Sequence, residues 1–261
     1  MSNVTTANAF PVVSYRCQVI AVSPLSSDTF QVELASPVGT SVEYHAGQYL
    51  QLELDLNNNG SPQSLFYSVA NHFDPKQARR LILFIQNGSE FADQVLKRLV
   101  DMAKKNAQIN VTLPMGQAFL QTNPDLPHLL IAAGSGISKI KCITEEILKR
   151  LPDAHVNIYW SNKNVKDFYL FDEFQGWLNK YKNLKFTPVL EKAKDDWIGR
   201  TGYLYEVIQE DFEDLSDAQT YLCGSPQMVY GTMDKLKASG LNEESCYSDV
   251  FEYSPRGKKF A

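Results

Sequence analysis

The sequence has few cysteines, and their spacing excludes the common metal and cluster sites. The four cysteines of the 261-residue chain are Cys17, Cys142, Cys223 and Cys246. No two of them have the C-x₂-C spacing of a zinc site, and the spacings of a ferredoxin-type iron–sulfur cluster are absent as well. Redox chemistry in this protein would therefore need an organic cofactor.

Long apolar runs and an excess of basic residues are also missing. The longest apolar stretches, such as Leu129–Ala133, have the length of a strand, whereas a membrane span needs about 18 residues. No basic residue or apolar core precedes Arg16, so neither a secretory signal nor disulfides are expected. The net charge of −5 argues against a nucleic-acid surface. The composition predicts a soluble cytoplasmic protein that binds neither nucleic acid nor a membrane.

The first half of the chain has the pattern of a small β domain. Turn clusters such as "SPLSSD" and "NNNGSP" separate short apolar segments, as in an antiparallel β-barrel or sandwich. A helix is predicted between Ser89, a plausible N-cap, and Lys105. The predicted strands are Tyr15–Val22, Thr29–Leu34, Tyr49–Leu54, Tyr67–Ala70, Leu81–Ile85 and Ile109–Leu113.

The second half alternates strands and helices, which predicts a doubly wound parallel α/β sheet. "HLLIAA" is typical of a buried parallel strand, and "HVNIYW", "LKFTPVL" and "TYLCG" predict further strands. Pro226 and Gly240 bracket the last helix. We expect an N-terminal tail over residues 1–13, a barrel domain over 14–124, an α/β domain over 125–253 and a loose tail over 254–261, with the boundary near 122–126.

A glycine pair directly follows the "HLLIAA" strand. Gly134 and Gly136 in "GSGISK" would let backbone N–H groups approach a phosphate at a helix N-terminus, although a tight strand-to-helix turn is the alternative. Lys139 stands where the dinucleotide fingerprint has its third glycine, and no acidic residue ends the next strand. Ser161 and Lys163 there are either ligands of a 2′-phosphate or exposed loop residues.

Other single residues remain ambiguous from the sequence. Cys223 at the end of a strand points toward the ligand crevice of such a sheet or is an inert buried thiol. Gly47 and Gly116 mark either close backbone approaches or barrel corners. Ser68, in "SLFYSVAN", is either a strand-end cap or a ligand-binding hydroxyl. The histidines and serines form no readable triad.

These motifs together resemble one superfamily. "AGQYL", "YSVAN", "LPMG", "GSGIS" and "CGSPQM" occur in the order and at the intervals of the ferredoxin–NADP⁺ reductase superfamily, across residues 14–253. Within it the chain is similar to the NAD(P)H:flavin oxidoreductases, a branch without an iron–sulfur domain. The resemblance implies a flavin (FMN, FAD or riboflavin) on the barrel and NADH or NADPH on the α/β domain. Hydride would pass from nicotinamide C4 to flavin N5.

The resemblance also assigns residues. The family motif R-x-Y-S falls on Leu65, Phe66, Tyr67 and Ser68, whose hydroxyl would bond near N5, and Cys223 and Gly224 fall on the motif beside the nicotinamide. Ser68 and Cys223 are the predicted catalytic residues, and Phe251 and Tyr253 match a C-terminal aromatic segment near the flavin. The remaining predicted cofactor contacts are Val69, Ala70, Pro114, Gly116, Gly134, Ser135, Gly136, Ile137, Ser161, Lys163 and Met228.

One departure from the motif bears on function. Leu65 replaces the arginine that faces the flavin phosphate in the family, unless Arg79 or Arg80 supplies the missing charge. This predicts a weakly bound, exchangeable flavin. Three functions follow: a flavin reductase that releases reduced flavin, a reductase component serving a partner oxygenase or iron–sulfur protein, and a non-catalytic flavin- or nucleotide-binding module, for which Leu65 is the best argument.

Overall fold

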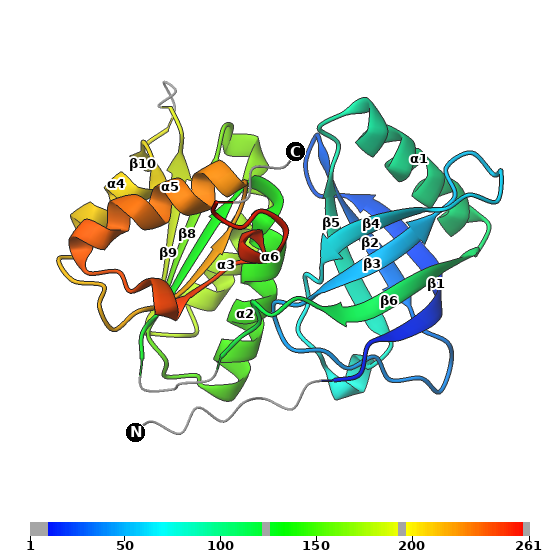
Figure 1. Cartoon of the computed structure of the whole chain (residues 1–261), viewed down its shortest axis with the longest axis horizontal. Coiled ribbons are helices and arrows are strands. Elements are labelled where there is room, and N and C mark those ends of the chain that lie inside the picture. Colours follow the sequence, from blue (N-terminus) through cyan, green and yellow to red (C-terminus); the bar gives the residue numbers. More distant parts are fainter. Residues whose placement is uncertain (1–9, 122–125, 193–196, 258–261) are drawn as a thin grey trace. The chain divides into compact units, whose positions relative to one another are not determined.

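The computed structural model describes residues 10–121, 126–192 and 197–257, which form two compact units (Figure 1). One unit contains the chain up to Gln121 together with Lys141–Glu146, and the other contains the remainder. Most of the boundary expected near residues 122–126 lies outside the described residues.

The N-terminal unit is an antiparallel sheet with one helix. Its strands follow the order β4-β3-β6-β1-β2-β5, and the sheet curls so that the Ala70 N–H, just beyond β4, bonds to the Ile82 carbonyl of β5 at 2.8 Å. Helix α1 (Glu90–Lys104) begins after Ser89, whose hydroxyl accepts from the Ala92 N–H, as expected. The strands are β1 (Val13–Pro24), β2 (Thr29–Ala35), β3 (Tyr49–Leu54), β4 (Gln63–Ser68), β5 (Arg80–Gln86) and β6 (Gln108–Met115).

Alternation along these strands separates the core from solvent. Leu50, Leu52 and Leu54 of β3 are buried, and the residues between them face outward. Strand β4 differs from its predicted range, because it starts at Gln63 and ends at Ser68 rather than spanning Tyr67–Ala70. Its first half is polar and exposed at the sheet edge, so it lacks the apolar signal of a strand.

The C-terminal unit is a parallel sheet with helices on both faces, which confirms the predicted α/β class. The strand order is β10-β9-β8-β7-β11-β12, and every adjacent pair is parallel. The strands are β7 (His128–Ala133), β8 (Val156–Asn162), β9 (Leu184–Leu190), β10 (Arg200–Thr201), β11 (Gln219–Cys223) and β12 (Cys246–Tyr247). The helices are α2 (Ile137–Arg150), of which Lys141–Glu146 group with the N-terminal unit, α3 (Phe171–Leu178), α4 (Leu204–Asp211), α5 (Pro226–Leu236) and α6 (Val250–Tyr253).

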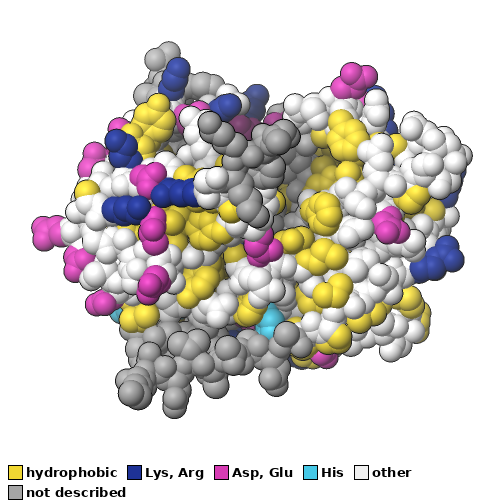
Figure 2. All heavy atoms as spheres, viewed as in Figure 1, with side chains coloured by type: hydrophobic (Ala, Val, Ile, Leu, Met, Phe, Trp, Pro, Cys, Tyr) yellow, Lys and Arg dark blue, Asp and Glu magenta, His cyan; other side chains and the backbone are white. Residues whose placement is uncertain are grey.

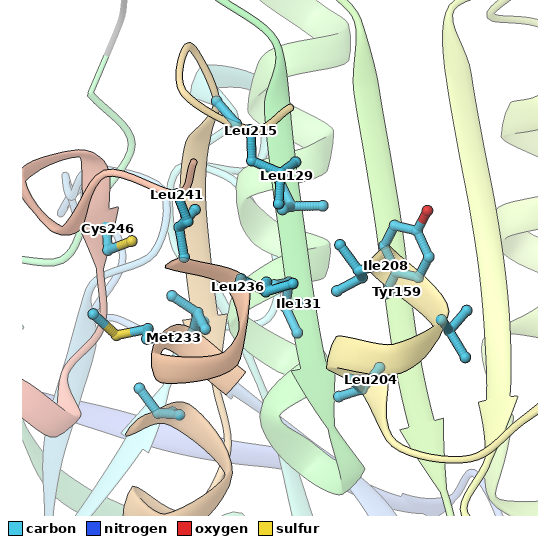
Figure 3. Close-up of a cluster of buried hydrophobic side chains, with 14 of the residues drawn as sticks. Leu129, Ile131, Tyr159, Leu204, Ile208, Leu215, Met233, Leu236, Leu241 and Cys246 are labelled. Atoms are coloured by element: carbon cyan, nitrogen blue, oxygen red, sulfur yellow. The ribbon is translucent and has the colours of Figure 1, made fainter. Parts of the chain in front are cut away.

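A buried apolar cluster joins α4 and α5 to one face of this sheet. Ile131 of β7 and Leu222 of β11 pack with Ile208 of α4 and Met233 of α5, and all four are nearly inaccessible (Figure 3). On the other face, the buried Trp160 of β8 meets aromatic residues including Phe174 of α3. The order in which successive strands are added to the sheet reverses between β7 and β11. Parallel sheets bind ligands at the carboxyl ends of the strands at such a point.

Two expectations about the chain as a whole can be compared with the structure. The described residues contain no helix long and apolar enough to cross a membrane, and all four cysteines are free. The expected loose tail is wrong for its first part, because Arg256 forms ion pairs with Asp234 and Glu243 and lies 4.5 Å from the Tyr230 ring. Residues 258–261 lie outside the described range.

Candidate cofactor sites

The register of the N-terminal sheet brings the predicted flavin-binding motifs together at one end. Tyr49 of β3 pairs with Ser68 of β4 on one side and with Met115 of β6 on the other. Three motifs that are far apart in sequence, "GQYL", "FYS" and "PMG", therefore form one row across neighbouring strands. Gly47 (φ 101°) and Gly116 (φ 91°) flank this row in a backbone conformation that favours glycine.

The outward face of this row carries an exposed aromatic side chain beside a free hydroxyl. Phe66 is 59 % exposed and meets the Tyr49 ring edge-on at 6.1 Å. Ser68 follows Phe66 on the same face, and its hydroxyl has no hydrogen-bond partner in the described part of the chain. Figure 2 shows hydrophobic side chains gathered over β3, β4 and β6. Ser68 is therefore not a strand-end cap, and this face suits a flat ring that needs one hydrogen bond.

Leu65 and Tyr67 lie on the opposite face of β4. They pair with the buried Leu52 and Leu50, respectively, so position 65 belongs to the apolar side of the strand. Burial raises the pKa of the Tyr67 hydroxyl to about 12, which keeps it neutral. The neighbouring Val69 and Ala70 are fully buried, so their side chains belong to the core in this structure.

Both arginines that could replace the missing motif arginine have other partners in this structure. Arg80 forms an ion pair with Glu33 at 3.1 Å, and the Arg79 Nε donates to the Ser36 carbonyl at 2.8 Å. Both partners belong to β2 or the turn that follows it. Arg80 is thus already paired with a carboxylate, and one guanidinium nitrogen of Arg79 is bonded to a backbone carbonyl.

A cavity next to Gly116 was not predicted from the sequence. It has a volume of about 580 Å³ and is lined by the predicted contacts Pro114 and Gly116 together with Gln48 and aromatic residues. Gln48 shapes the cavity, since it accepts from the His45 N–H at 2.8 Å and donates to the Gly116 carbonyl at 3.1 Å. The His45 ring stacks on Phe119 at 4.7 Å. The motifs "HAGQYL" and "LPMG" contain the sequence signals for this arrangement.

In the C-terminal unit, the glycine turn and the cysteine motif meet at the carboxyl ends of β7 and β11. Cys223 is in register with Ala132, the residue two before Gly134. A Cβ at Gly136 would lie 2.3 Å from the Cys223 carbonyl oxygen, closer than any side chain permits. Glycine is thus required at position 136 because two strand ends converge there, and the turn lies at the predicted ligand crevice.

The turn itself is held by specific hydrogen bonds. The Trp160 indole N–H donates to the Gly134 carbonyl at 2.9 Å, and the Ser138 hydroxyl donates to the Ser135 carbonyl at 2.8 Å. Gly134, Ser135 and Gly136 remain partly accessible and lead directly into α2, whereas Ile137 is fully buried. An accessible turn at the positive end of a helix fits a pyrophosphate group.

Cys223 is a neutral thiol at this position. Burial raises its pKa to about 11, so the side chain is protonated near neutral pH and is not an activated nucleophile. Lys139 and Asp249 lie near it and act on its pKa in opposite directions. Gly224 follows at the start of the loop to α5, and Met228 in the first turn of that helix packs against the core cluster.

The two C-terminal aromatic residues differ in their surroundings. Phe251 stacks on Tyr230 at 5.8 Å and packs against the core cluster. Tyr253 is 57 % exposed, and its pKa is raised by burial of its hydroxyl and by nearby groups that include Cys223 and Asp249. Tyr253 is therefore better placed than Phe251 to meet a ligand beside Cys223.

The structure corrects one prediction about the residues at the end of β8. Ser161 belongs to β8 and is only 6 % exposed, so the alternative of an exposed loop residue is wrong for it. A strand that continues two residues beyond its aromatic run buries this position. Lys163 is exposed, as expected.

Comparisons with known proteins agree with this architecture. Residues 130–234 match the oxidoreductase NAD-binding domain. A probable flavin reductase from Aliivibrio fischeri is 27 % identical over 93 % of this chain and 99 % of its own. A CDP-6-deoxy-L-threo-D-glycero-4-hexulose-3-dehydrase reductase from Yersinia pestis is 28 % identical over 91 % of this chain and 69 % of its own. The solved structure of the Amycolatopsis cytochrome P450 reductase GcoB has a TM-score of 0.80, with 24 % identity over 92 % of this chain and 70 % of its own.

The matched domain and the fold together confirm the resemblance that the motifs indicated. Residues 130–234 match an NAD-binding domain, the chain is similar over most of its length to proteins named flavin reductase, and it has the two-unit fold of solved ferredoxin reductase-type structures. The individual site residues stay predictions.

Proposed function

We propose that this protein is an NAD(P)H:flavin oxidoreductase in which the flavin is a weakly bound substrate. The observation that carries the proposal is the pair of sites described above: an open aromatic face with a free hydroxyl, and a glycine turn at the carboxyl edge of a parallel sheet. The match over nearly the full length of a probable flavin reductase supports the same activity.

The cofactors supply the reactive atoms, and the protein supplies binding and orientation. The chemistry is hydride transfer from nicotinamide C4 to flavin N5. In the proposed arrangement, Ser68 hydrogen-bonds near N5, Phe66 packs on the ring, and Gly134–Gly136 hold the pyrophosphate. Cys223 contributes a neutral, polarizable contact beside the nicotinamide rather than a nucleophile, because its thiol stays protonated.

Weak flavin binding follows from the residues around position 65. The apolar Leu65 pairs with Leu52, and Arg79 and Arg80 are bonded elsewhere. Loss of one charge-assisted hydrogen bond to a phosphate costs roughly 1.5–3 kcal/mol, or one to two decades of affinity. We therefore expect riboflavin and FMN to bind with similar dissociation constants.

Titration of the flavin-free protein with riboflavin, FMN and FAD tests this proposal, together with NADH and NADPH oxidation in the presence of each flavin. The expected result is flavin-dependent turnover and a ratio of riboflavin to FMN dissociation constants below about 3. A protein that stays stoichiometrically yellow through extensive dialysis, or that prefers FMN by a hundredfold, contradicts the weak-substrate part. Absence of turnover with intact nucleotide binding would identify a non-catalytic module.

A second candidate function is electron delivery to a protein partner. It is favoured by the likeness to reductases that serve other enzymes, a hexulose dehydrase reductase and a cytochrome P450 reductase. A partner oxygenase or iron–sulfur protein would then be the acceptor. Turnover that requires an added acceptor protein, with little free-flavin reduction, would support this function over the first.

A further inference from the structure

A lysine is buried at the start of the helix that follows the glycine turn. Lys139 lies in the first turn of α2 and is only 1 % exposed. Its Nζ forms an ion pair with Asp249 Oδ1 at 2.7 Å. Burying an ammonium group is costly unless it is paired, so the position of Asp249 is coupled to that of Lys139.

Asp249 lies immediately before the short helix α6, and this places a second side chain. The Tyr253 N–H bonds to the Asp249 carbonyl at 3.3 Å, which closes one helical turn. Residues four apart on a helix share a face, so Asp249 and Tyr253 point to the same side. Gly136, three residues before Lys139, meets the Cys223 carbonyl, so the ion pair brings Asp249 and the face that it shares with Tyr253 to the strand end that carries Cys223. The electrostatic effects of Asp249 on Cys223 and of Cys223 on Tyr253 agree with this placement.

Other contacts of α6 and of the residue after it involve residues other than Asp249 and Tyr253, including a hydrogen bond from the Tyr230 hydroxyl to the Ser254 carbonyl at 2.8 Å. Val250 belongs to the apolar core, and Phe251 stacks on Tyr230. These contacts hold the helix to α5 from its other side, whereas the ion pair ties the face that carries Tyr253 to the beginning of α2. One charged pair thus links the glycine turn, the cysteine and the C-terminal aromatic residue.

We propose that Lys139 is a positioning residue: through its ion pair with Asp249 it holds α6 so that Tyr253 covers Cys223 and shapes the nicotinamide subsite. This inference rests on the proposed function for its catalytic consequence, but the placement of Tyr253 over Cys223 can be measured without any turnover.

The test replaces the buried pair by apolar residues. The variant Lys139→Met/Asp249→Leu removes both charges, which avoids leaving one of them unpaired in the interior. Lys139 lowers and Asp249 raises the pKa of the Cys223 thiol. Removing both charges therefore has opposing effects on this pKa and on the reactivity of the thiol. Lys149→Met, in the exposed last turn of α2, removes one of the same charges from the same helix and serves as the control.

The first readout is the alkylation rate of each cysteine with iodoacetamide at pH 8.5, measured by peptide mass spectrometry. We expect Cys223 to react at least tenfold faster in the double variant, with the rates of Cys17, Cys142 and Cys246 unchanged. Those three thiols are buried, so general unfolding would accelerate all four. An unchanged rate at Cys223, or equal acceleration at every cysteine, overturns the proposal.

The second readout is the kinetics of flavin reduction with nicotinamide deuterated at C4. A displaced nicotinamide subsite should lower kcat by about tenfold and increase the isotope effect on kcat, with KM changed less than threefold. A double variant that melts at the wild-type temperature and keeps wild-type kcat, isotope effect and Cys223 alkylation shows that the pair is only structural. If the wild-type protein lacks turnover, the proposed function fails, and the alkylation result still decides the positioning role.

Discussion

The two candidate sites differ in whether they consist mainly of backbone or of side-chain groups. In the C-terminal unit the site is mostly backbone: Gly134–Gly136 form a turn whose path is dictated by contact with the Cys223 carbonyl. In the N-terminal unit the site is mostly side chain, with Phe66, Tyr49 and Ser68 presented on the outward face of a sheet edge. A backbone site tolerates few substitutions, whereas a side-chain site can lose one donor, such as the motif arginine, and keep its fold.

This difference also separates what each unit contributes. In the proposed function, backbone N–H groups would recognise the phosphates that NADH and NADPH share, whereas the residues around Leu65 would set how tightly a flavin is held. Substitutions in the glycine turn should therefore cause a large loss of nucleotide binding, whereas substitutions on the flavin-binding face should reduce flavin binding or turnover gradually. Three variants test this contrast.

Gly136→Ala should have the largest effect. The added methyl group overlaps the Cys223 carbonyl at 2.3 Å, and overpacking against backbone costs about 3 kcal/mol. Nucleotide affinity should fall at least tenfold, as measured by titration with NADH and NADPH, together with the melting temperature. Gly176→Ala is the matched control because a methyl group added at that position of α3 would meet open space. Wild-type behaviour of Gly136→Ala would show that the turn and the cysteine motif do not meet.

His128→Leu tests a buried side chain of the C-terminal unit that lies away from the glycine turn. His128 is the first residue of β7, and the glycine turn follows the other end of that strand. Burial lowers the pKa of His128 to about 4, and neither ring nitrogen has a hydrogen-bond partner among the described residues. The unfolded chain, with a pKa near 6.5, therefore binds more protons between pH 6.5 and 4, so the folded state loses stability as the pH falls through this window.

Between pH 7 and 4.5 the wild-type protein should lose about 2 kcal/mol more stability than His128→Leu. Urea denaturation followed by circular dichroism at both pH values measures the difference. His155→Leu, an exposed histidine just before β8, should keep the wild-type acid sensitivity. Equal acid sensitivity in wild type and His128→Leu would remove His128 as its cause.

Ser68→Ala should have the smallest and most local effect. Loss of one hydrogen bond to the reacting ring costs about 1.4 kcal/mol, which corresponds to a tenfold lower kcat/KM for flavin. Nucleotide affinity and melting temperature should stay unchanged. The control Ser64→Ala removes an exposed hydroxyl from the same face of β4. Unchanged flavin kinetics in Ser68→Ala would exclude this residue from the site.

The backbone-based features were predictable from the sequence. The parallel strands, Gly134 and Gly136, the N-cap Ser89 and the helix between Pro226 and Gly240 all have local signals, and the structure agrees with them. Backbone chemistry leaves such signals because only certain residues permit a given turn or cap.

Features that depend on packing between distant segments were not predictable. The start of β4 is polar and exposed, so its strand character comes from pairing with β3. The burial of Ser161 depends on the length of β8, and the Lys139–Asp249 pair joins residues 110 positions apart. Lys139 was visible in sequence only as a departure from a glycine pattern, and its acidic partner had no local signal.

The hydrogen bond from the Trp160 indole to the Gly134 carbonyl has a practical consequence. The Trp160 indole, an intrinsic fluorophore, is thus hydrogen-bonded to the first residue of the glycine turn. A nucleotide that settles on this turn would shift the carbonyl and the indole together and change the emission of Trp160. We therefore expect a change in tryptophan emission on addition of nucleotide that is lost in Trp160→Phe.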